Sequence, residues 1–270
     1  MNTVASKVLL QMVKMIPVLW LLCQSQAGYS QFSEVVSQEK PFKSGEKINY
    51  YVKFGPIIGG HATLSLKQSY LDNRMVYYAR GEGKTVGLAE KLYSVKDIFE
   101  SYFDLNTLLP YKAIRDVKEG NYRKRDEAIF YHGNNTVYCV RKDTLISVPA
   151  RTMDMVSVLY YLRSLDLQNM TPGTVLHPVT FFNEALFPFD IRYKGKEILK
   201  TKFGKIKCFR FDPVVEPGRM FASEDDMIIW ISADQNMIPV KVRFDLLVGS
   251  LHMELAEYDN LKYPLGILPD

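Results

Sequence analysis

Most of the chain alternates between apolar and polar residues with a period of two, the pattern of β-strands that bury one face. In KINYYVKF, the apolar face carries Ile48, Tyr50, Val52 and Phe54. A second such strand, HATLSLKQ, follows the glycine- and proline-rich turn GPIIGG. Further strands are expected at residues 75–81, 98–105, 111–119, 122–131, 136–141, 144–148, 175–182, 189–193, 197–203, 205–212, 227–232, 239–246 and 250–258.

Turn residues separate these segments, and helices do not alternate with them. This arrangement is typical of antiparallel sheets, because parallel strands need a long crossover between them. Large antiparallel sheets curl or close, since open edges invite aggregation. The sequence therefore predicts a mainly β protein, a large curved antiparallel sheet or incomplete β-barrel, formed by a single domain over residues 42–262.

One long segment, MDMVSVLYYLRSLDLQNMTPG at residues 153–173, has the period of a helix instead. Its apolar stripe consists of Met155, Val158, Leu159, Leu162 and Leu165. Thr152 or Asp154 can cap its beginning and TPG ends it, which gives about fourteen residues and a length of about 20 Å. Because the stripe needs an apolar partner, we expect this one main helix to pack on the concave face of the sheet.

The first 27 residues have the features of a signal peptide. Lys7 and Lys14 precede the apolar run MIPVLWLLCQSQA, and small residues permit cleavage after Ala27 or, alternatively, after Ser30. An uncleaved anchor is disfavoured because the apolar run is too short to span a bilayer. Bulky leucines just before Cys23 disfavour a lipid anchor. We therefore expect an exported bacterial protein that is soluble in the periplasm or associated with the outer membrane.

Charge and motifs exclude several functions. The 34 Lys and Arg nearly balance 30 Asp and Glu, which does not favour nucleic-acid binding. GEGKT at Gly81–Thr85 resembles the end of a phosphate loop, but Tyr78 replaces its first glycine, so we expect a β-turn and no nucleotide. The four histidines lack metal-ligand spacing, and the acidic residues 224–226 lack the pattern of a calcium loop. We expect neither a metal nor another cofactor.

Cys139 and Cys208 remain after signal cleavage. An oxidising compartment permits a disulfide between them, and two buried free thiols are the alternative. The sequence leaves both open.

Five segments together resemble domain-of-unknown-function family 3108, exported proteins common in the Bacteroidetes. They are SGEKINYYVKFGPIIGGHATLSL, YSVKDIFESYFDLNTLLP, MDMVSVLYYLRSLDL, KFGKIKCFRFDP and IIWISADQNMIPVKVRF, and the resemblance runs from about Phe42 to about Asp259. That family is similar in fold to periplasmic lipoprotein carriers and mycobacterial lipid-binding lipoproteins, which are incomplete β-barrels that hold helical lids. The resemblance implies this architecture and no catalytic residues.

Two groups of side chains are candidates for binding. The apolar helix stripe and the segment FFNEALFPF, which we expect to contain a turn, would line or rim a ligand cavity through Met155, Leu159, Leu162, Phe181, Phe182 and Phe187. Exposed, the phenylalanines of FFNEALFPF would alternatively contact a membrane surface, and folded inward they would be core. Arg123 and Arg125 share one face of a strand and would contact an anionic group. An exposed charged strand that protects a sheet edge is the alternative for them.

Asp97, Glu100 and Asp104 lie close together in KDIFESYFD, and paired carboxylates can carry out acid–base chemistry when their environments separate their pKa values. In a strand, Asp97 points to one face and the other two point to the opposite face. Structural hydrogen bonding explains them better, so we expect no catalytic residues and no enzyme.

Three functional hypotheses follow. The first is a non-enzymatic exported protein that binds or carries a lipid or another amphiphilic envelope molecule. The second is an envelope scaffold whose barrel is filled by side chains, and the third is an unrecognised envelope hydrolase. A cavity of several hundred cubic ångströms would distinguish the first from the second.

Overall fold

The computed structural model of the chain describes residues 39–188, 190–214, 223, 226–247 and 249–269. The expected signal peptide, both of its cleavage sites and two of the acidic residues at 224–226 lie outside the described residues. Within the described residues, no helix is long and apolar enough to cross a membrane.

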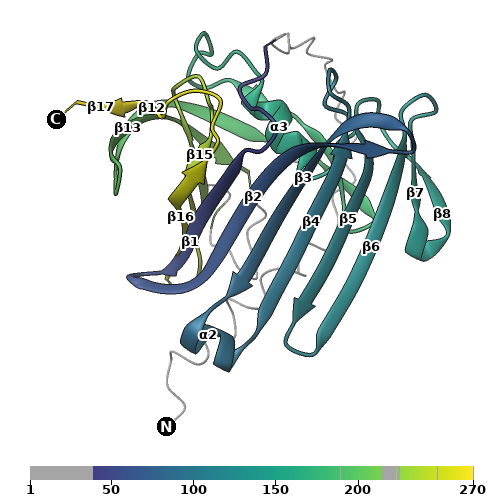
Figure 1. Ribbon diagram of the computed structural model, residues 1–270, viewed down its shortest axis with the longest axis horizontal. Coiled ribbons are helices and arrows are strands. Elements are labelled where there is room, and N and C mark those ends of the chain that lie inside the picture. Colours follow the sequence, from purple (N-terminus) through teal and green to yellow (C-terminus); the bar gives the residue numbers. More distant parts are fainter. Residues whose placement is uncertain (1–38, 189, 215–222, 224–225, 248, 270) are drawn as a thin grey trace.

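Strands that pair mainly with their neighbours in sequence build one large antiparallel sheet with two wings (Figure 1). The first wing consists of β1 (Lys47–Phe54), β2 (Ile57–Leu71), β3 (Arg74–Thr85), β4 (Val95–Phe103), β5 (Pro110–Glu119), β6 (Tyr122–Tyr131), β7 (Thr136–Cys139) and β8 (Thr144–Ser147). The second consists of β9 (Val175–Leu176), β12 (Ile191–Thr201), β13 (Gly204–Pro213), β14 (Met227–Ser232), β15 (Pro239–Asp245), β16 (Ser250–Asp259) and β17 (Ile267–Leu268).

The two wings join where β1 pairs with β16, and the sheet does not close into a barrel. Its order is β8-β7-β6-β5-β4-β3-β2-β1-β16-β15-β14-β13-β12-β9, with β17 added on β13. A separate hairpin is formed by β10 (Val179–Phe182) and β11 (Ala185–Pro188). The predicted mainly β, curved antiparallel sheet with a helix on its concave face is therefore confirmed.

Most predicted strands are present, and the differences concern glycines and turns. The segments 189–193 and 197–203 are one strand, β12, because a register shift between Tyr193 and Gly195 interrupts the alternation. The predicted β-turn at Gly81–Thr85 is wrong. Gly81 and Gly83 lie inside β3 and pair on both sides, Gly83 with Ala62 and with Asp97.

The helix is half as long as predicted. α3 spans Ser157–Arg163 and is preceded by a turn that Asp154 stabilises, since its Oδ1 accepts the N–H groups of Val156 at 2.7 Å and Ser157 at 3.1 Å. A second helix, α2 (Gly87–Leu92), and a 3₁₀ turn, η1 (Val140–Lys142), were not predicted.

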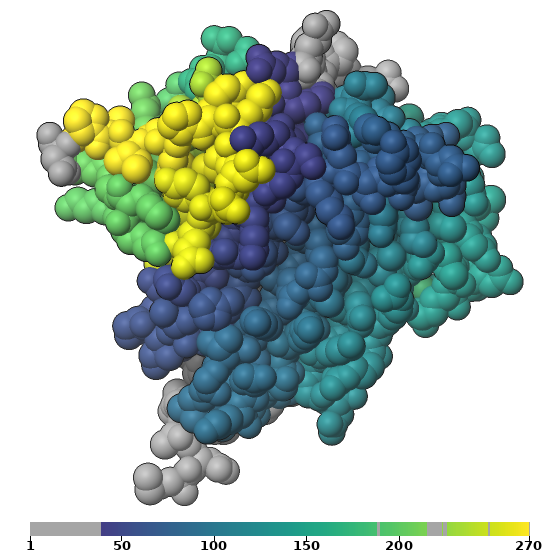
Figure 2. Space-filling model, in the orientation of Figure 1, coloured from purple at the N-terminus to yellow at the C-terminus, as the bar shows by residue number. Residues whose placement is uncertain are grey.

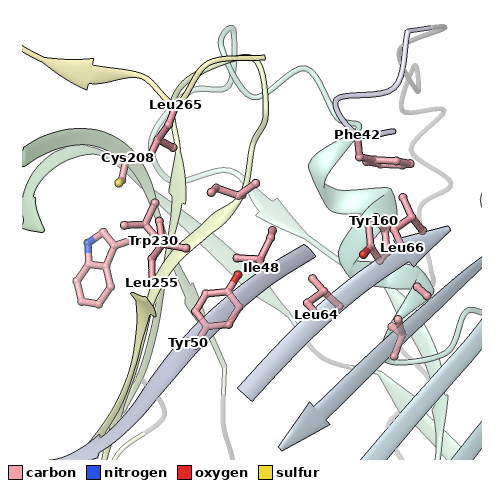
Figure 3. Packing of buried hydrophobic residues seen from close by; sticks show 14 of the residues in the cluster. Phe42, Ile48, Tyr50, Leu64, Leu66, Tyr160, Cys208, Trp230, Leu255 and Leu265 are labelled. Atoms are coloured by element: carbon pink, nitrogen blue, oxygen red, sulfur yellow. The ribbon is translucent and has the colours of Figure 1, made fainter. Parts of the chain in front are cut away.

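The face that α3 buries also differs from the predicted stripe. Val158 is buried as expected, but Leu159 and Leu162 are only half-buried. Tyr160 and Arg163, two residues with polar groups, are fully buried instead. Figure 3 shows Tyr160 between Phe42 and Leu66, and the Phe42 and Tyr160 rings meet edge to face at 4.9 Å.

A buried ion pair explains this orientation of α3. The Arg163 guanidinium donates to both oxygens of Glu46, just before β1, at 2.7 and 2.8 Å. It also donates to the backbone carbonyl of Asn236, between β14 and β15, at 2.9 Å. Since Glu46 and Asn236 belong to different wings, this single side chain fixes the helix to both.

The charges of Arg163 and Glu46 should depend on each other, so that removing one costs more stability than removing both. We expect Glu46→Gln to lower the free energy of unfolding by about 3–5 kcal/mol, because it leaves a buried guanidinium without its counter-charge. Urea denaturation at neutral pH measures this loss, and Glu46→Met combined with Arg163→Met should recover at least half of it.

The half-buried surface pair of Lys53 and Glu254, 2.6 Å apart, supplies the control. Lys53→Met should cost less than about 1 kcal/mol, because water screens this pair. Equal costs for Glu46→Gln and Lys53→Met would contradict the role assigned to Arg163.

Candidate functional site

The upper part of the concave face is filled by protein. Residues 154–156, α3 and the β10–β11 hairpin pack there, and the pocket left beneath them has a volume of about 50 Å³. That volume holds a water molecule or two but no lipid, since ligand pockets usually measure about 300–1,000 Å³. Three predicted binding residues line it, namely Met155, Phe181 and Phe182.

The other predicted cavity residues lie apart from this pocket. Leu159 packs against the main core cluster and Leu162 against the core of the second wing. The Phe187 ring lies 6.2 Å from Phe182, and the Phe182 ring stacks on Phe99 of β4 at 6.3 Å. The predicted turn in this segment is correct, because Asn183 and Glu184 connect the two strands of the hairpin with positive φ angles.

A charged network, not recognised in the sequence, ties the hairpin to the first wing. Asp126 of β6 accepts from Lys124 at 2.9 Å and from Arg141 at 2.9 Å. Glu184 of the hairpin also pairs with Arg141, and Arg115 of β5 donates to Asn183 at 3.0 Å. Apart from Lys124 and Asp126, which are neighbours on one face of β6, these partners are 15 to 68 residues apart in sequence, so no local pattern could reveal most of the network.

Beside this network, Asp97 of β4 and Glu119 of β5 form a buried carboxyl pair on the concave face. They are 2% and 1% exposed, and one oxygen of each has no hydrogen-bond partner in the structure. Burial raises the pKa of Asp97 to about 6. Burial and repulsion by Asp97 raise the pKa of Glu119 to about 7. Close to neutral pH, the pair therefore holds a proton that can be given up or shared.

The predicted separation of Asp97 from its acidic neighbours is correct. Glu100 lies on the convex face, where it accepts a hydrogen bond from the Tyr78 hydroxyl. Asp104 follows β4 and accepts the backbone N–H groups of Asn106 and Thr107 at 2.9 and 2.8 Å. Of the three predicted carboxylates, only Asp97 thus lies on the concave face. Its partner Glu119 lies on the same face and was not among the sequence candidates.

The lower part of the concave face is apolar and half-open. Strand register places Met227, Phe244, Leu251 and Phe54 in one row across β14, β15, β16 and β1. The next row consists of Ile229, Val242, Met253 and Val52. All but Val242 are half-buried, whereas the next side chains along β1, Tyr50 and Ile48, are fully buried in the core. We call these two rows the apolar floor.

Small residues connect the apolar floor to the carboxyl pair. Next to Val52 and Tyr50, β2 carries Gly60 and Ala62, and β3 then carries Gly83 beside Asp97. A Cβ atom at Gly83 would meet nothing within 4 Å. The concave face is therefore shallow between the apolar floor and the carboxyls, and a bound molecule could reach both.

Arg123 and Arg125 lie on the opposite, convex face. Both are exposed, with Arg123 donating to the carbonyls of Gly120 and Tyr122 at 2.7 Å and Arg125 3.8 Å from Asp116. Around these two residues β6 pairs with β5 alone, because β7 pairs only with Ala128–Tyr131, so both arginines lie on a stretch of sheet edge, which fits the alternative role of protecting it.

Both cysteines are free and buried, on different wings. The described residues contain no group of His, Cys, Asp and Glu side chains that could hold a metal ion.

These features define an open antiparallel half-barrel with a partly filled concave face. Residues 47–256 match the family described as protein of unknown function DUF3108, and the chain belongs to that family. No curated protein matches the sequence.

Two solved structures resemble this chain at low identity. A β-barrel-like protein of domain of unknown function DUF1849 from Brucella abortus is 8% identical with a TM-score of 0.51, over 83% of this chain and 100% of that chain. A Bacteroides fragilis protein with a YmcC-like fold, described as a proposed exported protein, is 9% identical with a TM-score of 0.35, over 82% of this chain and 98% of that chain. At 8% identity, the likeness to the Brucella abortus protein shows the fold alone.

The raised pKa values of the carboxyl pair predict that stability depends on pH. The folded state binds these protons more tightly than the unfolded chain, whose carboxyl pKa values lie near 4. The resulting stabilisation is present in acid and is lost as the pH rises through about 6 to 7. In the wild type, the free energy of unfolding should fall by on the order of 3 kcal/mol between acid and neutral pH. Asp97→Asn combined with Glu119→Gln should abolish this fall, and urea denaturation at both pH values measures it.

Asp116→Asn combined with Glu82→Gln provides the matched control on the convex face of neighbouring strands. This control should keep the pH dependence of the wild type. An identical pH dependence in the carboxyl-pair variant and the wild type would contradict the assignment.

Proposed function

We propose that the protein is an exported, non-catalytic binding protein that holds an amphiphilic molecule with an acyl chain on the lower part of its concave face. The observation that carries this proposal is the apolar floor. Seven of its eight side chains remain partly exposed although they continue the rows of a fully packed core. Leaving so much contiguous apolar surface in contact with water is unfavourable, and such surfaces commonly mark binding sites.

The dimensions of the apolar floor suit an acyl chain. Neighbouring strands lie about 4.8 Å apart, so four strands from β14 to β1 give an apolar width of about 14 Å. The shallow region of Ala62 and Gly83 continues the path by about the same distance to β4. There Asp97 and Glu119 are buried and each keeps one unsatisfied oxygen, which a polar head group that donates hydrogen bonds would reach by displacing the atoms that cover it. The acyl chain would therefore lie across the strands, with its head at the carboxyl pair.

A second candidate is the envelope scaffold, and the small pocket under the β10–β11 hairpin favours it. With only about 50 Å³ left there, the upper half of the bowl is packed as a structural core. Under this alternative, the apolar floor would bind no small amphiphile.

Gly83 permits a direct test, because a side chain placed there extends into open space over the concave face. We expect Gly83→Trp to weaken the binding of a dansylated undecanoic acid at least about tenfold, since the indole would occupy the path between apolar floor and carboxyl pair. Dansyl fluorescence measured during titration reports the affinity.

Gly133→Trp is the matched control. Gly133 also has open space around its Cβ position but lies in the β6–β7 turn. This variant should bind the probe as the wild type does. No uptake by the wild type would favour the scaffold, and equal binding by both tryptophan variants would place the site elsewhere.

A further inference from the structure

Basic side chains form a row across consecutive strands on the convex face of the first wing. Lys84 pairs directly with Lys96, Lys96 with Lys118, and Lys118 with Arg123. All four are exposed, and His61 continues the row on β2 opposite Lys84. We call Lys84, Lys96, Lys118 and Arg123 the basic ladder.

Like charges directly opposite each other on neighbouring strands destabilise a sheet. Three strand intervals of about 4.8 Å place all four cations of the basic ladder within about 15 Å. Within the part of the chain that the structure describes, Lys84 and Lys96 form no ion pair, and Lys118 reaches Asp116 only at 3.9 Å. The repulsion is thus little compensated by the protein itself, as expected for a surface that meets an anionic partner.

A hollow adjoins the basic ladder on the same face. Its volume is about 240 Å³, and its lining combines hydroxyl and cationic groups. The lining residues are Lys47, His61, Thr63, Ser65, Arg80, Glu82 and Lys84. Glu82, its one acidic group, is already paired with Arg80 at 2.6 Å. The hollow therefore suits a phosphate-bearing head group.

Exposed apolar side chains lie at the end of the sheet nearest to the basic ladder. Ile57 (67% exposed) and Ile58 begin β2, and α2 presents Leu88 (73%) and Leu92 (59%) to solvent. We call these four residues the apolar tips. Figure 1 shows the β1–β2 turn, α2 and the β5–β6 turn at this same lower end.

The basic ladder and the apolar tips are close enough to act together. Each ladder residue is the second or the penultimate residue of its strand, so it lies within about 7 Å of the strand end. The convex face that carries the ladder is open in the space-filling view of Figure 2, where β2 to β6 form its blue and teal surface. Glu90 on α2 is the acidic residue beside Leu88 and is matched by Lys91.

We propose that this end of the protein docks on a bilayer rich in anionic phospholipids. The apolar tips would enter the interfacial region, while the basic ladder and the hollow would contact phosphate groups. An anionic polymer would account for the ladder but not for the apolar tips, which need an apolar medium to be buried. The basic ladder and the hollow lie on the opposite face of the sheet from the apolar floor. Of the apolar tips, Ile57 adjoins the floor as the strand partner of Phe54, so the tests change Leu88 and Leu92 and the proposal does not depend on the amphiphile site.

Sedimentation with phosphatidylcholine vesicles, with and without phosphatidylglycerol, tests the proposal. The wild type should bind only the anionic vesicles, and less so as salt increases. Each basic residue near an anionic surface strengthens binding roughly fivefold. Replacing the four ladder residues by Gln should therefore reduce binding at least about tenfold and leave the unfolding midpoint unchanged or higher, because repulsion is removed.

A control with the same change of charge lies on the second wing. Gln at Lys196, Lys200, Lys202 and Lys207, exposed on β12, β13 and their turn, should change binding less than about threefold. Failure of the wild type to bind anionic vesicles, or an equal loss in the two variants, would overturn the proposal.

The apolar tips separate a bilayer from a soluble polyanion. Leu88→Ser combined with Leu92→Ser should weaken vesicle binding at least about fivefold and leave binding to soluble polyphosphate unchanged. Unchanged vesicle binding would overturn the bilayer as partner in favour of a polyanion.

Gly83→Trp should bind vesicles normally and the ladder variant should take up the dansylated acid normally, so failures of the two proposals are distinguishable.

Discussion

The bidentate contact between Arg163 and Glu46 is the interaction on which the arrangement of the concave face depends. It joins α3 to the strand β1, and the third hydrogen bond, to Asn236, joins it to the other wing. An open sheet has no barrel closure to set its curvature, so a buried contact that spans both wings constrains it instead. Because the charges are removed from water, the contact is more valuable for positioning than for net stability. The rest of the core, including the Phe42 and Tyr160 rings, packs around this position.

Fixing the helix at the upper end divides the bowl into two parts. Above, residues 154–156, α3 and the β10–β11 hairpin fill the space and leave only a small pocket. Below, the same sheet face continues without a covering helix among the described residues and carries the half-buried rows of Val52 and Phe54. The carboxyl pair lies at the side of this open part, where burial keeps its pKa values near neutrality. The upper half of the concave face is thus filled by protein, and the lower half is left open among the described residues.

The alternation of apolar and polar residues was sufficient to predict the sheet, because each strand buries one face and the period of two records it. The pattern was misleading where glycine supplies no side chain to alternate. A turn was predicted at Gly81 and Gly83, which lie inside β3, and two strands were predicted where β12 is one. The helix was predicted too long because an apolar stripe continues through Leu165, although the chain leaves the helix at Ser164. The residues that matter most around the site were the hardest to find. Arg163 and Glu119 look like surface residues in the sequence. A partner 117 residues away makes the burial of Arg163 tolerable, and the raised pKa of Glu119 lets this carboxyl be buried with a proton.

Photo-crosslinking with a diazirine-bearing fatty acid, followed by peptide mass spectrometry, tests the central claim most directly. If the apolar floor holds an acyl chain, the labels should fall on peptides of β1, β15 and β16, above all at Val52, Phe244 and Met253. Labels confined to the convex face, or spread evenly over the chain, would contradict it.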